Sequence, residues 1–128
     1  MNLPATWRGG RVNTTFPAVR MTIHIHGSES WHHKPLAAEI VHRAHQFGLA
    51  GASVFHGAEG FGSSSVVHTG HPMSISDELP LVIIVVDVPE RIEAFLPQLV
   101  GLIDHGMITL EEVTAIRYAP PAAGQRGR

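Results

Sequence analysis

Apolar and polar residues alternate regularly from Val19 to His26, so that one side of this stretch is apolar and the other is polar. Successive side chains of a strand point to opposite faces, and the pattern therefore predicts a half-buried strand. Weaker alternation predicts a second strand over Ala50–His56. A continuous run of Leu, Val and Ile predicts a third strand, buried on both faces, over Leu79–Asp87. A fourth strand is expected over Met107–Tyr118, with an irregularity near Glu111–Glu112.

Two further segments carry apolar residues at helical spacing. Pro35 fits the first turn of a helix, where its missing N–H is not needed, and Gly48 is a typical C-terminal stop. Pro89 opens the second helix. Pro97 lies inside the apolar stripe of that helix and removes a backbone donor, so we expect a kink or a break there. The two stripes are Leu36, Ala37, Ile40, Val41, Ala44 and Phe47, and then Ile92, Phe95, Leu96, Leu99 and Ile103.

The resulting order of elements is β-α-β-β-α-β. Two crossover helices on one face of a four-stranded antiparallel sheet form an α+β ferredoxin-like sandwich. We expect this domain to span residues 18–118, between a flexible N-terminal extension (residues 1–17) and a disordered tail rich in Pro, Gly and Arg (residues 119–128). The second face of the sheet would be open to water unless another subunit covers it.

Composition narrows the class of protein. The net charge is -2 and the chain holds a single lysine, so we expect no positively charged surface that could bind a nucleic acid backbone. Charged residues make up only 16% of the chain, which indicates that a subunit interface covers part of the surface. The sequence has no apolar run of transmembrane length and no secretion signal, so we expect a cytoplasmic protein that is not itself a membrane protein.

The segment between the second and third strands is long and rich in glycine and serine. Loops of this length in a compact domain are usually functional or disordered. Gly57, Gly60 and Gly62 can present backbone N–H groups, and Ser63 and its two serine neighbours add hydroxyl donors, which together could cradle an anion. The alternative interpretation is a strand end with a bulge, followed by a mobile loop. Glu59 would repel a phosphate, but it could hold a ribose hydroxyl, an adenine amino group, a cation or an arginine of a neighbouring subunit.

Two cations could neutralise a bound phosphate. Lys34 lies at the start of the first helix and Arg117 near the end of the last strand. Either could equally be a solvated surface charge. Arg43 and Arg91 have the positions of ordinary helix-surface residues.

Ten histidines are many for this length. His24 and His26 share a strand face and could hold a metal ion if another subunit supplied a third ligand, although the spacing matches no known metal motif. No nucleophile–base–acid set is recognisable, and we expect no enzyme activity.

One family resemblance is carried by long stretches of sequence. The stretches GLAGASVFHGAEGFGSSS, HTGHPMSISDELPLVIIVVD and ERIEAFLPQL…GMITLEEV, with Lys34-Pro35-Leu36 at the first helix, closely resemble the PII-like family known as domain of unknown function 190. The resemblance covers about Val19 to Tyr118. It implies a relative of the PII signalling proteins, which are homotrimers of ferredoxin-like subunits that bind nucleotides in clefts between subunits. The connection Asp104–Met107 lacks the lysine of the phosphate-binding loop in the PII proteins.

The resemblance also implies a function. The protein would bind an effector, with an adenine nucleotide (AMP, ADP or ATP) as the expected one and no obligatory cofactor. The loop at residues 59–79 would regulate a partner protein such as a membrane transporter or channel. The implied nucleotide-binding residues are Lys34, Gly57, Glu59, Gly60, Phe61, Gly62, Ser63, Gly106 and Arg117. The alternatives are a metal-binding trimer similar to the divalent-cation-tolerance proteins and an interaction module without an effector.

Overall fold

The computed structural model describes residues 13–60, 68–69 and 79–118. Its main sheet is antiparallel and has the order β4-β7-β1-β8. These four strands are β1 (Asn13–His26), β4 (Ser53–His56), β7 (Pro80–Asp87) and β8 (Met107–Tyr118). The helices are α1 (Leu36–Phe47) and α2 (Pro89–Val100), and the short strand pairs are β2 (Ser30–Trp31) with β3 (Lys34–Pro35) and β5 (Glu59–Gly60) with β6 (His68–Thr69). The predicted ferredoxin-like α+β fold is confirmed.

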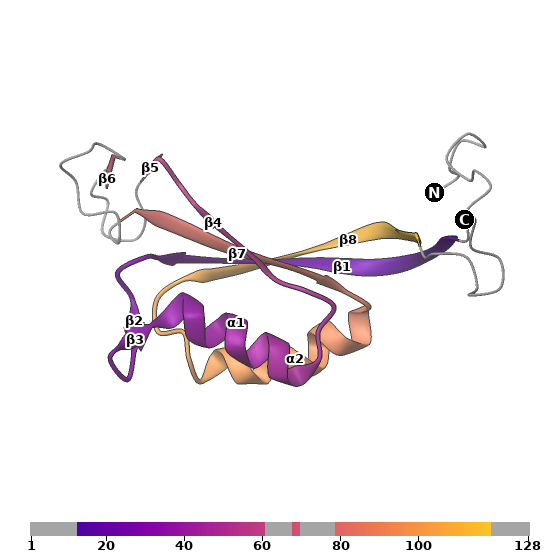
Figure 1. Ribbon diagram of the computed structural model, residues 1–128, viewed down its shortest axis with the longest axis horizontal. Helices are drawn as coiled ribbons and strands as arrows, with labels where there is room; N and C mark the ends of the chain where they lie inside the picture. The colour runs from indigo at the N-terminus through magenta and orange to yellow at the C-terminus, as the bar shows by residue number, and fades with distance from the viewer. Residues whose placement is uncertain (1–12, 61–67, 70–78, 119–128) are drawn as a thin grey trace, which may run out of the picture.

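Both helices lie on one face of the sheet, as Figure 1 shows. The alternate residues Met21 and Ile23 of β1 and Ile83 and Val85 of β7 point to that face and are at most 1% exposed. They form the core with the apolar stripes of α1 and α2, in which Ile40, Phe95 and Leu99 are fully buried. None of the helices that the structure describes is long and apolar enough to cross a membrane.

The first strand is longer than the apolar pattern predicts. It begins at Asn13 rather than Val19, so residues 13–17 of the predicted flexible extension belong to the sheet. The reason is tertiary, because β8 continues to Tyr118 and pairs with this part of β1, from His24↔Met107 to Asn13↔Tyr118. The predicted extension at residues 1–12 and the predicted tail at residues 119–128 lie outside the described residues.

Helix α2 runs through Pro97 without a break, and the predicted break is wrong. Pro97 lies in the last turn and is exposed, so its missing N–H leaves only one carbonyl of the preceding turn without a helical donor, and water can reach this side of the helix. The helix ends at Val100, and the Ile103 N–H still donates to the Leu99 carbonyl in the following turn, at 3.0 Å.

Strand β4 begins three residues after the predicted start at Ala50.

The predicted irregularity in β8 is also absent. The pairing with β1 keeps one register over the whole strand, and Glu111 lies opposite Arg20. Their side chains form an ion pair of 2.7 Å on the open face of the sheet. The two charges therefore neutralise each other, and the strand stays regular at this point.

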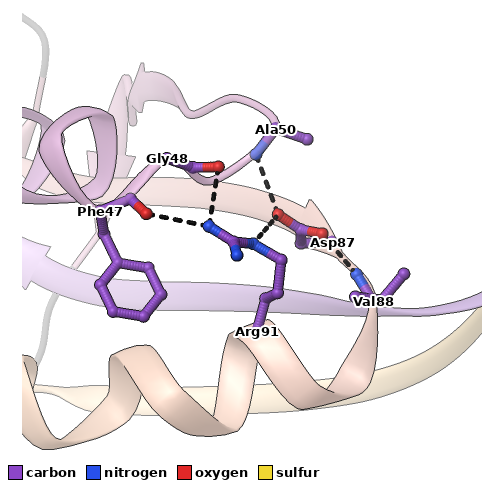
Figure 2. A network of polar contacts seen from close by, with 6 residues as sticks. All are labelled: Phe47, Gly48, Ala50, Asp87, Val88 and Arg91. Carbon is purple, nitrogen blue, oxygen red and sulfur yellow. Dashed lines mark hydrogen bonds and ion pairs between the residues drawn. The ribbon is translucent and has the colours of Figure 1, made fainter.

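A polar network joins the end of α1 to the start of α2 (Figure 2). Asp87, which is 8% exposed at the end of β7, accepts hydrogen bonds from the Ala50 N–H at 2.9 Å and the Val88 N–H at 2.7 Å. Arg91 lies 3.6 Å from the Asp87 carboxylate and donates to the carbonyls of Phe47 and Gly48 at the C-terminus of α1. Arg91 is therefore not an ordinary surface residue, because from α2 it donates hydrogen bonds to the last carbonyls of α1.

Candidate functional site at the base of the long loop

The long segment leaves the sheet where β4 ends and β7 begins. We call this place, formed by Gly57, Gly60 and Pro80, the loop base. The Gly57 N–H donates to the Pro80 carbonyl at 2.7 Å. A Cβ atom would lie 2.7 Å from Pro80 Cγ at Gly57 and 2.9 Å from the same atom at Gly60. Both glycines are therefore required by the close approach of Pro80. This packing role, which the sequence did not indicate, comes in addition to any role in anion binding.

The segment then folds back on itself. Glu59 pairs with Thr69 and Gly60 with His68 in the short β5–β6 ladder. The Glu59 side chain is exposed at this position, so a ligand can reach its carboxylate. Phe61, Gly62 and Ser63, which the sequence places in the same site, lie outside the described residues.

Strand β3, which contains Lys34, and the start of β8, which follows Gly106, lie at the same end of the molecule as β5 (Figure 1). Lys34 is exposed in β3, and β8 starts next to Gly106 with Met107 opposite His24. A Cβ atom at Gly106 would lie only 2.7 Å from the His24 carbonyl oxygen. Gly106 is therefore required by close backbone packing of the α2–β8 connection against β1.

Arg117 lies at the opposite end of the sheet. It is opposite Thr14, whereas Pro80 at the loop base is opposite His26. The twelve steps between Thr14 and His26 at about 3.3 Å each separate the two places by about 40 Å. The Arg117 guanidinium carbon lies 5.0 Å from the centre of the Phe16 ring. Within one subunit, the structure therefore does not bring Arg117 together with the other candidate residues.

A carboxylate that the sequence analysis missed lies near the start of β8. Partial burial raises the pKa of the Glu29 carboxyl above its ordinary value of 4.5, and Asp104 acts in the same direction. His26 and His105 act in the opposite direction by favouring the charged form of Glu29. Glu29 carries no motif in the sequence, and only the approach of the α2–β8 connection places Asp104 and His105 near it.

The turn before Lys34 is conformationally unusual. His32 and His33 have φ angles of 50° and 66°, a left-handed region that is uncommon for residues other than glycine. The His32 ring lies 4.1 Å from the Trp31 ring, and Arg43 lies 5.1 Å from the centre of the Trp31 ring. The Arg43 side chain is also paired with Glu39 at 2.8 Å, so this arginine too has a structural role.

His24 and His26 share the open face of β1, as the alternation predicts, and both are half-buried. Among residues 13–60, 68–69 and 79–118, no group of three histidine, aspartate or glutamate side chains is close enough to hold a metal ion.

Comparison with solved structures defines the class of fold. The chain is similar to CPII of Thiomonas intermedia K12, described as a nitrogen regulatory PII-like protein bound to ADP, AMP and bicarbonate. The TM-score is 0.55 and the identity 18%, over 80% of this chain and 91% of CPII. A putative PII-like signalling protein from Thermus thermophilus matches with a TM-score of 0.53 and 14% identity, over 80% of this chain and 91% of that one. The fold is therefore PII-like.

The family follows from the sequence comparisons. The chain belongs to the DUF190 family, described as "Uncharacterized ACR, COG1993", whose family model matches residues 18–115. A UPF0166 protein of Aquifex aeolicus (strain VF5) is 34% identical over 88 residues, which are 69% of this chain and 83% of that protein. The family expected from the quoted sequence stretches is confirmed.

Proposed function

We propose that this protein is a PII-like regulator that binds an adenine nucleotide between the subunits of a homotrimer. The observation that carries the proposal is the loop base, where Gly57 and Gly60 lie against Pro80 and fix the start of a long glycine- and serine-rich segment at the edge of the sheet. The solved structures of CPII, a protein of the same fold, with ADP and AMP support an adenine nucleotide as the ligand.

The site is built from two subunits in this proposal. Lys34, Glu59 and Gly60 come from one end of a subunit, and Arg117 comes from the other end of a neighbour. A single subunit cannot supply both, because about 40 Å of strand β1 separate them. The exposed guanidinium of Arg117 would then bind phosphate oxygens through its fork of N–H donors.

Nucleotide binding would favour one conformation of the segment at residues 59–79 and so change its affinity for a protein partner, for which we propose a membrane transporter or channel. A ligand shifts such an equilibrium only by its difference in affinity for the two conformations. The short β5–β6 ladder supports this role, because it pairs the backbone of two parts of the segment next to the proposed ligand site.

Titration calorimetry of the full-length protein with AMP, ADP and ATP tests the proposal. We expect one adenine nucleotide to bind per subunit, and we expect Arg117→Gln and Lys34→Gln each to weaken binding by about tenfold, or about 1.4 kcal/mol. Arg117→Lys should lose less, since it retains the charge. If none of the three nucleotides binds to a folded protein, the proposed function is wrong.

The proposed role is binding rather than catalysis. Incubation of the protein with ATP should therefore release no inorganic phosphate above the rate of a heat-denatured sample. Phosphate release from ATP that co-purifies with the folded protein would contradict this part of the proposal.

A further inference from the structure

Helix α1 leaves one side of strand β4 uncovered. All four residues of β4 are exposed, and none belongs to the core cluster of buried residues in the described part of the chain. On the helix side, Val54 is 38% exposed although an apolar residue at this position would normally be buried. The apolar helix residues that face this side are Ala37, Ala38 and Val41, and the two alanines are too small to fill the space.

The result is a groove between α1 and β4, which we call the α1–β4 groove. Its volume is about 690 Å³, which falls within the range of about 300–1,000 Å³ typical of small-molecule sites. Leu81, which is 3% exposed, also lines it, together with Gly27 after the end of β1 and Pro35 at the start of α1. The groove lies on the helix side of the sheet and is lined by none of Lys34, Glu59, Gly60 and Arg117.

The polar lining of the groove consists of imidazoles. His42 and His45 come from α1 and His56 comes from β4, and none of the described residues that line the groove is acidic. Imidazole nitrogens donate hydrogen bonds in the neutral and in the charged form. A metal ion does not fit these three residues, because no such group of three is close enough among the described residues. The lining therefore favours a hydrogen-bond acceptor attached to an apolar body.

We propose that the α1–β4 groove binds a small amphipathic carboxylate, with its apolar body against Val41, Val54 and Leu81 and its carboxylate at the histidines. The proposal does not depend on nucleotide binding, because none of the described residues that line the groove is among those proposed to bind the nucleotide, and the ligand class differs. His56 directly precedes Gly57, so a ligand in the groove would also contact the residue from which the long segment starts.

The test uses octanoate as the probe and titration calorimetry on the full-length protein. We expect saturable binding of one octanoate per chain, with octylamine, which has the same chain but a cationic head, not competing. Ala38→Trp places a large side chain in the groove from an exposed helix position and should weaken octanoate binding by more than about tenfold. Ala94→Trp, the same change at an exposed position of α2 outside the groove, should have less than a twofold effect.

A second variant separates the head group from the apolar body. His42→Leu keeps the bulk of the side chain but removes its donors, and it should weaken the binding of octanoate but not of octanol. Absence of saturable octanoate binding, or equal affinity in wild type and Ala38→Trp, would overturn the proposal. So would a change of oligomeric state in Ala38→Trp by light scattering, because the groove would then be a contact between copies of the chain.

Discussion

At the scale of single residues, the buried carboxylate of Asp87 has the clearest structural role. It accepts two backbone hydrogen bonds and pairs with Arg91, which in turn donates to the end of α1. The sequence marks Asp87 only as the last residue of a strand and Arg91 only as a helix residue. The pair itself is local, because the two residues are four apart in the chain. Their bonds to Ala50 and to the last carbonyls of α1 depend on how closely the α1–β4 connection approaches the β7–α2 connection, and no local pattern encodes that approach.

The stability contribution of Asp87 can be measured. Asp87→Ala leaves two backbone N–H groups without their acceptor and should lower the free energy of unfolding by about 2 kcal/mol. Asp87→Asn keeps one side-chain acceptor and should lose less. Urea denaturation of both variants, with Glu93→Ala at an exposed position of α2 as the control, measures these differences. Equal stability of Asp87→Ala and Glu93→Ala would contradict the assigned role.

Glu29 makes stability depend on pH in a defined direction. Its folded pKa is raised above 4.5, so the folded state holds its proton more tightly than the unfolded state does. Its contribution to stability is therefore present at pH below 4.5 and is lost as the pH rises through the folded pKa. Glu29→Gln cannot ionise and should raise the melting temperature at pH 7 relative to wild type, with a smaller difference at pH 4. A difference that does not change with pH would exclude this explanation.

At the scale of elements, the β2–β3 hairpin combines good pairing with an unfavourable turn. Two-residue hairpin turns with positive φ at both central positions strongly favour glycine, yet here both positions are histidine. His33→Gly should therefore stabilise the protein by about 0.5–1 kcal/mol. The control His42→Gly, in the middle of α1, should destabilise it by about 1 kcal/mol. Thermal unfolding compares the two, and a loss of stability in His33→Gly would show that side-chain contacts of His33 outweigh its backbone strain.

The junction of β4 and β7 can be tested with a pair of glycine substitutions. Gly57→Ala forces a Cβ atom to within 2.7 Å of Pro80 Cγ and 3.3 Å of its carbonyl oxygen. We expect a loss of about 1–3 kcal/mol in stability from this overpacking. Gly51→Ala meets no atom within 4 Å and serves as the matched control, with little change expected. Chemical denaturation with intrinsic fluorescence measures the stability of both variants. Unchanged stability of Gly57→Ala would show that the backbone at the loop base can shift to accommodate the methyl group.

At the scale of the whole molecule, one face of the sheet carries an apolar surface that no element of the described structure covers. Phe55 is 53% exposed there, next to the half-buried Val82 and Ile84. In the proposed homotrimer this face would line the centre of the assembly. The low fraction of charged residues had indicated only that a subunit interface covers part of the surface.

Substitutions on the two faces distinguish this assembly from a monomer. Ile84→Glu places a charge in the middle of the open face and should convert the trimer into monomers in light scattering. Val100→Glu alters a residue that is 80% exposed on α2 and should leave the mass unchanged. A wild-type protein that is monomeric at micromolar concentration would refute the homotrimer and, with it, the two-subunit nucleotide site.

The sequence by itself determined the two helices, the four strands of the main sheet and the fold class. Alternation in β1, the continuous apolar run of β7 and the helical stripes were sufficient, because burial of a strand face or helix stripe is imposed locally by side-chain periodicity. The glycines that follow β4 were visible in the sequence as well, although their contact with Pro80 was not.

Tertiary structure alone decided which of those residues meet. Pairing with β8 extended β1 to Asn13, close contact with Pro80 explained Gly57 and Gly60, and the length of the sheet separated Arg117 from the loop base. The α1–β4 groove likewise depends on how α1 lies across the sheet. Such features depend on contacts between residues far apart in the chain, and periodicity carries no information about those distances.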